Sequence, residues 1–114
     1  MSLNLSVQLR VMGQLSTELY DWGRQMRDRV NRIQGAPSSA LPPLTLSRQI
    51  VSLRGIDQRL YDFARLSRNA LSNRSVSPAN SPSLSLDYEL AAMKQISQEL
   101  FEFGTQLQAA INAL

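Results

Sequence analysis

Residues 19–23 read LYDWG, and their pattern decides the fold because the chain contains it three times. It returns as LYDFA at residues 60–64 and as LFEFG at residues 100–104, at spacings of 41 and 40 residues. Each copy holds a leucine, an aromatic residue, an acid, a second aromatic residue and a small residue. A fixed period of this length is typical of repeated supersecondary units that bury a common face.

The apolar residues around each copy follow a helical period. We refer to residues 1–33, 44–74 and 84–114 as units 1, 2 and 3. In unit 1 an apolar residue recurs at every seventh position from Leu5 to Ile33, which indicates an amphipathic helix with one core-facing stripe. The predicted long helices span about residues 4–33, 46–72 and 86–113, and the Ser/Pro-rich linkers span residues 34–45 and 73–85.

These three helices predict an all-α fold in a single domain over residues 1–114. A seven-residue apolar line favours coiled-coil-like helices that cross at a shallow angle, in a three-helix bundle or in part of a larger helical assembly. The linkers are longer than an antiparallel neighbour needs, and a parallel return is at the limit of their reach. We expect up-down-up order, because two loose connections cost less than two taut ones.

The core-facing stripe carries one large ring and one small residue in each unit. The rings are Trp22, Phe63 and Phe103, and the small residues that follow them are Gly23, Ala64 and Gly104. Glycine inside a helix costs about 1 kcal/mol relative to alanine, so two glycines at one position indicate close helix packing. We predict one aromatic core layer at this level. The alternative is a ligand cavity lined by the rings.

One heptad before the small residues, the same line carries Ser16, Asp57 and Ser97. Within a long helix, Asp57 would interrupt an apolar stripe. We expect it to pair with an arginine of a neighbouring helix or to face solvent at the edge of the bundle.

The formal net charge of +3 is distributed unevenly along the chain. Units 1 and 2 carry +2 and +4, whereas unit 3 carries −3. One interpretation is an acidic third helix packed beside two basic helices. The other is a basic face that awaits an acidic partner.

A basic stripe supports the second interpretation. On the second predicted helix, three arginines share one shoulder with Tyr61, and the first helix repeats the pattern beside Tyr20. Guanidinium groups suit phosphates and tyrosine rings can stack on bases. The candidate residues for binding nucleic acid or an acidic partner are Arg24, Arg27, Arg54, Arg65 and Arg68.

The chain lacks the residues that several kinds of catalysis require. The chain has no histidine and no cysteine, so it has no imidazole base and no thiol nucleophile. We expect no enzyme activity, no catalytic residue, no metal, no cofactor and no small-molecule substrate. Neither a standard leader nor an apolar run of membrane-spanning length is present, so we expect a cytoplasmic protein with no membrane span. A signal-independent export route would leave no such mark.

The favoured function is therefore a non-enzymatic interaction or structural module. It would bind a protein partner, or self-associate as a homo-oligomer, through its helix faces. The shoulder aromatic residues Tyr20, Tyr61 and Phe101 would form an outer contact line, because aromatic side chains are enriched at protein interfaces. The alternative is a small basic helical protein that binds nucleic acid.

Overall fold

Helices account for all of the regular secondary structure in the computed structural model, which describes residues 3–35, 44–77 and 81–114. The elements are α1 (Ser6–Leu15), α2 (Thr17–Gly35), α3 (Ser47–Ser52), the 3-10 turn η1 (Leu53–Gly55), α4 (Gln58–Val76), α5 (Asp87–Ile96) and α6 (Gln98–Asn112). The six α-helices form a globule with a Cα radius of gyration of 13.1 Å. The all-α prediction is confirmed.

Each of the three long helices expected from the sequence is broken into a short and a long segment. The breaks fall at Ser16, Asp57 and Ser97, where the backbone is extended with φ of −165°, −165° and −164°. The prediction of unbroken helices over 4–33, 46–72 and 86–113 is therefore wrong. The longest dimension of the molecule is 36 Å, shorter than the ~40 Å that each unbroken helix would need at ~1.5 Å per residue.

The breaks have a local cause, because the residue at each one caps the helix that follows. The Ser16 hydroxyl accepts a hydrogen bond from the Leu19 N–H at 3.1 Å, and the Ser97 hydroxyl accepts one from the Leu100 N–H at 3.3 Å. Asp57 Oδ1 accepts a bond from the Arg59 N–H at 2.8 Å. Side chains of this kind satisfy N–H groups that have no partner inside the helix. Asp57 thus bonds within its own unit and not to a neighbouring helix.

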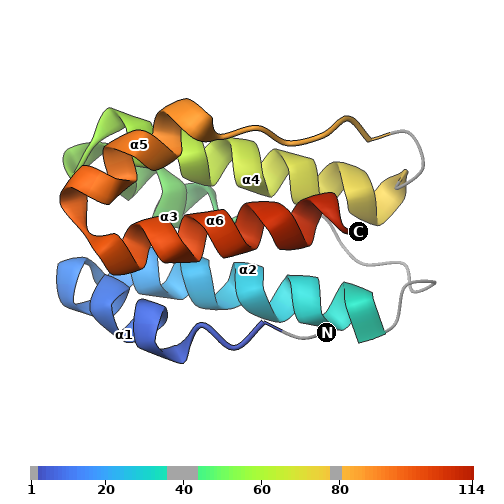
Figure 1. Cartoon of the computed structure of the whole chain (residues 1–114), viewed down its shortest axis with the longest axis horizontal. Helices are drawn as coiled ribbons and strands as arrows, with labels where there is room; N and C mark the ends of the chain where they lie inside the picture. Colours follow the sequence, from blue (N-terminus) through green and yellow to red (C-terminus); the bar gives the residue numbers. More distant parts are fainter. Residues whose placement is uncertain (1–2, 36–43, 78–80) are drawn as a thin grey trace.

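The long helices α2, α4 and α6 run in the same direction, which corrects the expected up-down-up order (Figure 1). In each unit the short helix runs back alongside the long one, so the three junctions lie at the same end of the molecule, on the left in Figure 1. A short helix and an extended segment together return the chain, so the linker alone does not have to span the bundle.

Each short helix packs between two long helices. Besides the long helix of its own unit, α1 packs on α6, α3 packs on α2, and α5 packs on α4. At the first of these contacts, Gln8 Nε2 donates to Glu102 Oε1 at 3.2 Å. The short helices therefore connect the units around the bundle, and no unit buries its apolar face alone.

The predicted aromatic layer lies at the centre of the molecule. Trp22, Phe63 and Phe103 are completely buried. The Trp22 ring meets Phe63 edge-on with centroids 5.3 Å apart, and its centroid lies 6.0 Å from that of Phe103. A Cβ placed on Gly23 would lie 3.2 Å from Phe103 Cζ, and one on Gly104 would lie 3.2 Å from Phe63 Cε1. The rings pack against one another and against the helix backbones, in place of a ligand cavity.

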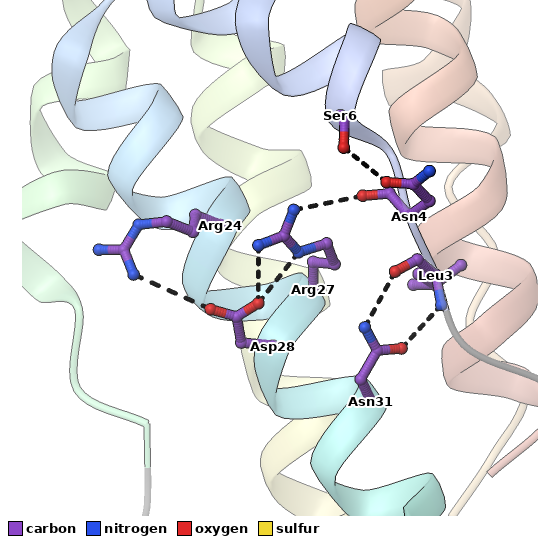
Figure 2. A network of polar contacts seen from close by, with 7 residues as sticks. All are labelled: Leu3, Asn4, Ser6, Arg24, Arg27, Asp28 and Asn31. Carbon is purple, nitrogen blue, oxygen red and sulfur yellow. Dashed lines mark hydrogen bonds and ion pairs between the residues drawn. The ribbon is translucent and has the colours of Figure 1, made fainter.

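The helices that precede the expected linkers, at residues 34–45 and 73–85, extend further than the sequence indicated. Helix α2 continues to Gly35 and α4 to Val76, while residues 36–43 and 78–80 lie outside the described residues. Two of the short helices, α1 and α5, each follow an extended segment, and an asparagine on a long helix holds each of these segments in place. Asn31 accepts from the Leu3 N–H at 2.7 Å and donates to the Leu3 carbonyl at 2.9 Å (Figure 2). Asn112 makes the same pair of bonds to Leu84, at 2.7 and 2.9 Å.

Candidate interaction surface

The shoulder aromatic residues Tyr20, Tyr61 and Phe101 lie in the first turns of α2, α4 and α6. All three are half-buried and pack against the core with one side. They come from three different long helices, each beside the short segment of its own unit. Their exposed parts therefore lie near the junction end of the molecule.

Two of these rings are covered by a cation from the preceding short segment. Arg54 places its Cζ 4.0 Å from the centre of the Tyr61 ring, and Lys94 places its Nζ 5.1 Å from the centre of the Phe101 ring. Cations at such distances are attracted by the negative face of the ring. Each cation precedes its ring by seven residues, and the equivalent residue in unit 1 is Gly13.

The third ring, that of Tyr20, borders an open hollow. Arg10, Gly13, Thr17 and Tyr20 line this hollow, which we call the Tyr20 hollow. A Cβ placed on Gly13 would contact Tyr20 Cδ1, Cβ and Cγ at 3.6–3.7 Å, which is an ordinary van der Waals distance. The Tyr20 ring is thus within reach of α1, but position 13 has no side chain to cover it.

The candidate arginines of unit 1 engage a carboxylate on their own helix. Arg24 Nη1 lies 3.9 Å from Asp28 Oδ2, and Arg27 Nη2 lies 2.9 Å from Asp28 Oδ1 (Figure 2). Arg27 Nη1 also donates to the Asn4 carbonyl at 3.2 Å, which ties α2 to the segment before α1. Exposed pairs of this kind contribute at most about 1 kcal/mol each to folding.

The candidate arginines of unit 2 do not form one stripe on one helix, because the break at Asp57 separates Arg54 from the other two. Arg65 Nη2 lies 3.7 Å from Asp62 Oδ1, and Arg68 Nη1 donates to the Thr45 carbonyl at 3.1 Å. Arg54 lies over the Tyr61 ring. Each of the three guanidinium groups thus has a partner within the chain.

Exposed apolar side chains concentrate on the short segments, a feature that sequence reasoning missed. Those found there are Val7, Leu15, Val51, Ile56 and Tyr88. Among the described residues of the long helices, only Val76 is a large apolar side chain with this degree of exposure. Leu15 and Ile56 stand at the breaks, where their side chains are 44% and 39% exposed.

Two arginines are buried, which charge counting alone did not indicate. Arg74 is 6% exposed, and its guanidinium donates to the Ala70, Pro82 and Asn112 oxygens at 3.2, 2.6 and 3.1 Å. It thereby holds the segment before α5 against α4 and α6. Arg29 lies buried on α2, where desolvation, and then the nearby charge of Arg32, lower its pKa.

The carboxylate of Asp57 lies beside Arg59, which changes its pKa. Hydrogen bonds from the Arg59 side chain, and then from the Arg59 N–H, lower the Asp57 pKa. Arg59 Nε lies 3.1 Å from Asp57 Oδ1, and this contact raises the Arg59 pKa. This pair stands at the α3–α4 junction, where it fixes the start of α4 and does not converge with other acids.

The described residues contain no group of three or more acids placed to hold a metal ion. In the same part of the chain, no helix combines the length and apolarity needed to cross a membrane. Comparisons of the chain with protein-family models, curated proteins and solved structures find no match.

Proposed function

We propose that the chain is a non-enzymatic protein-interaction module. It binds a protein partner or a second copy of itself through the junction end, where the short helices meet the long ones. The observation that carries the proposal is the concentration of exposed apolar side chains on α1, α3 and α5 and at their junctions with the long helices. Burial of such side chains in an interface is favourable, at about 1.5–3 kcal/mol for one that becomes fully buried.

The surroundings of these side chains support the same proposal. The half-buried rings of Tyr20, Tyr61 and Phe101 lie in the first turns of the long helices, next to the junctions where Leu15 and Ile56 stand. Aromatic and arginine side chains together are enriched in the centres of protein interfaces. The capping hydrogen bonds of Ser16, Asp57 and Ser97 would keep this end rigid, so a partner would lose little by ordering it.

Nucleic-acid binding remains the second candidate, because unit 2 carries a net charge of +4. Its candidate side chains Arg54, Arg65 and Arg68 are all engaged within the chain. A phosphate would have to replace these contacts, which weakens this candidate relative to protein binding.

Two exposed positions allow a test with a matched control. Leu15→Gln/Ile56→Gln removes apolar surface at the junction end, whereas Val76→Gln removes it from the far end of a long helix. Because all three side chains are exposed, circular dichroism should show unchanged helicity in both variants. Sedimentation velocity over a concentration series then measures self-association, and crosslinking in extracts of the source cells, with detection of bound proteins, measures partner binding.

The proposal predicts that association is lost in the junction variant and kept in Val76→Gln. A wild-type chain that stays monomeric throughout, and that crosslinks to no protein more than the junction variant does, would contradict it. Protein purified without nuclease serves to test whether nucleic acid is bound. A co-eluting species with excess absorbance at 260 nm, removed by salt, would place the second candidate first.

A further inference from the structure

We infer that the Tyr20 hollow receives a basic side chain, lysine or arginine, from a protein partner. The partner's cation would take the place over Tyr20 that Arg54 and Lys94 of this chain take over Tyr61 and Phe101. The inference rests on the proposed function in one respect only, which is that the cation belongs to a protein.

The first support is the comparison of three equivalent places in one molecule. Tyr61 and Phe101 have a cation at 4.0 and 5.1 Å from their ring centres, supplied seven residues upstream. Tyr20 occupies the same position in unit 1, but residue 13 is glycine and a hollow lies beside the ring. A tyrosine ring in this geometry attracts cations, and in unit 1 the chain supplies none at the equivalent position.

The second support is that Gly13 has no structural reason to be glycine. It lies within α1, its φ is not positive, and an added Cβ would make only ordinary contacts. Gly23 and Gly104 differ, because an added Cβ there would lie 2.7 Å from Met12 Cε and 2.5 Å from Leu90 Cδ2. Glycine lowers helix stability relative to alanine, so its presence at residue 13 is explained by the space it leaves.

The third consideration is the charge at the edge of the hollow. Arg10 also lines it, whereas the equivalent residues of units 2 and 3 are Val51 and Ala91. A guanidinium beside the ring repels a basic guest and attracts an acidic one. Neutralising Arg10 should therefore strengthen the binding of a basic guest, which makes this residue a sharp probe of the charge that the hollow prefers.

The experiment titrates the isotope-labelled full chain with N-acetyl-arginine methylamide, at constant ionic strength, and follows the Tyr20 ring and Gly13 amide signals by NMR. The glutamate and norleucine analogues test the alternative charges. Gly13→Ala places a methyl group against the Tyr20 ring, whereas Gly13→Lys places a cation of the chain over the ring. Tyr88, which is 68% exposed and interacts with the Arg59 side chain, reports binding at a surface tyrosine that already has a cation beside it.

The inference predicts that the arginine probe shifts Tyr20 more than Tyr88. Gly13→Ala, whose methyl group fills part of the hollow, should weaken the shift at Tyr20, but less than Gly13→Lys does. Gly13→Lys should weaken the probe's binding roughly two- to fivefold, and Arg10→Gln should strengthen it by a similar factor. Equal shifts at Tyr20 and Tyr88 would overturn the inference, and so would a preference for the glutamate probe that Arg10→Gln abolishes. Because the probes are small molecules, this result is independent of whether association at the junction end is observed.

Discussion

Unit 2 and units 1 and 3 fill equivalent places in the bundle with different local chemistry. The short segment of unit 2 is the six-residue α3 followed by η1, whereas α1 and α5 in the other units are regular ten-residue helices. Its junction is capped by Asp57, and those of the other units by serines. At the core position that Met26 and Leu107 occupy, unit 2 buries the hydroxyl of Ser67.

The difference shows which features the fold depends on. The leucine and the second aromatic ring of each motif are completely buried in all three units, and each junction has an oxygen that caps the next helix. The regularity of the short helix and the polarity of one core position vary without loss of the arrangement. The predictions below test the shared features first and the peculiarities of unit 2 afterwards.

Replacing the small residue of units 1 and 3 by leucine should have the largest effect. At both Gly23 and Gly104, the first added carbon already lies within 3 Å of a neighbouring side chain. We expect Gly23→Leu and Gly104→Leu each to lower the free energy of unfolding by about 2–3 kcal/mol, through overpacking. Thermal and urea unfolding measure the change. The control is Gly55→Leu in unit 2, where no atom lies within 4 Å of the added carbon, and an equal loss there would contradict the account.

Removing the junction cap of unit 2 should have the next largest effect. Asp57→Ala deletes the acceptor of the Arg59 N–H and should cost about 1 kcal/mol of stability, as loss of an N-cap commonly does. Ser97→Ala is the counterpart in unit 3 and should cost a similar amount. Urea unfolding of both variants measures the losses. If neither variant were destabilised, the caps would not be what holds the junctions.

Removing the buried hydroxyl of unit 2 should stabilise the protein. Ser67 is fully buried, and its Oγ has no hydrogen-bond partner among the described residues. Ser67→Ala should raise the free energy of unfolding by up to about 1 kcal/mol, because an unsatisfied polar group no longer has to leave water. Ser75→Ala on the same helix is the control, since the Ser75 hydroxyl donates to the Leu71 carbonyl at 3.0 Å. A gain in the control as large as in Ser67→Ala would remove this explanation.

The smallest expected effect is a pH dependence that only unit 2 contributes at its junction. The Asp57 pKa in the folded state lies below its ordinary value of 3.8, mainly because of the Arg59 side chain. The folded protein therefore binds this proton less readily than the unfolded chain does. The contribution to stability is present above the ordinary pKa and is lost as the pH falls through the lower folded value. Asp57→Asn should show a shallower loss of stability in acid than the wild type, and parallel curves would contradict this.

The sequence predicted the interior of the fold better than its topology. Heptad spacing identified the ring layer of Trp22, Phe63 and Phe103, because those rings face the core whether or not the helices are broken. Met12 and Leu19 also keep heptad spacing across the break, so the apolar line concealed it. A readable signal was present in unit 1, where Ser16 precedes Glu18 in a pattern suited to a helix N-terminus.

The direction of the long helices and the Tyr20 hollow were harder to predict. Linker length permitted either direction, and the short helices that return the chain became evident only once the breaks were located. Residues 13 and 20 can be aligned with their counterparts in the other units by eye. In one continuous helix, however, they would lie two turns apart, at ~10 Å along the axis. Only the folded-back α1 brings position 13 against the Tyr20 ring.

The account depends most on the claim that each unit is a helical hairpin and not one long helix. NMR measurement of Cα chemical shifts along the whole chain tests this directly. Helical shifts should be interrupted by extended values at Ser16, Asp57 and Ser97, with nuclear Overhauser contacts between α1 and α6 near Gln8 and Glu102. Unbroken helical shifts through the three positions, without contacts between those helices, would contradict the account.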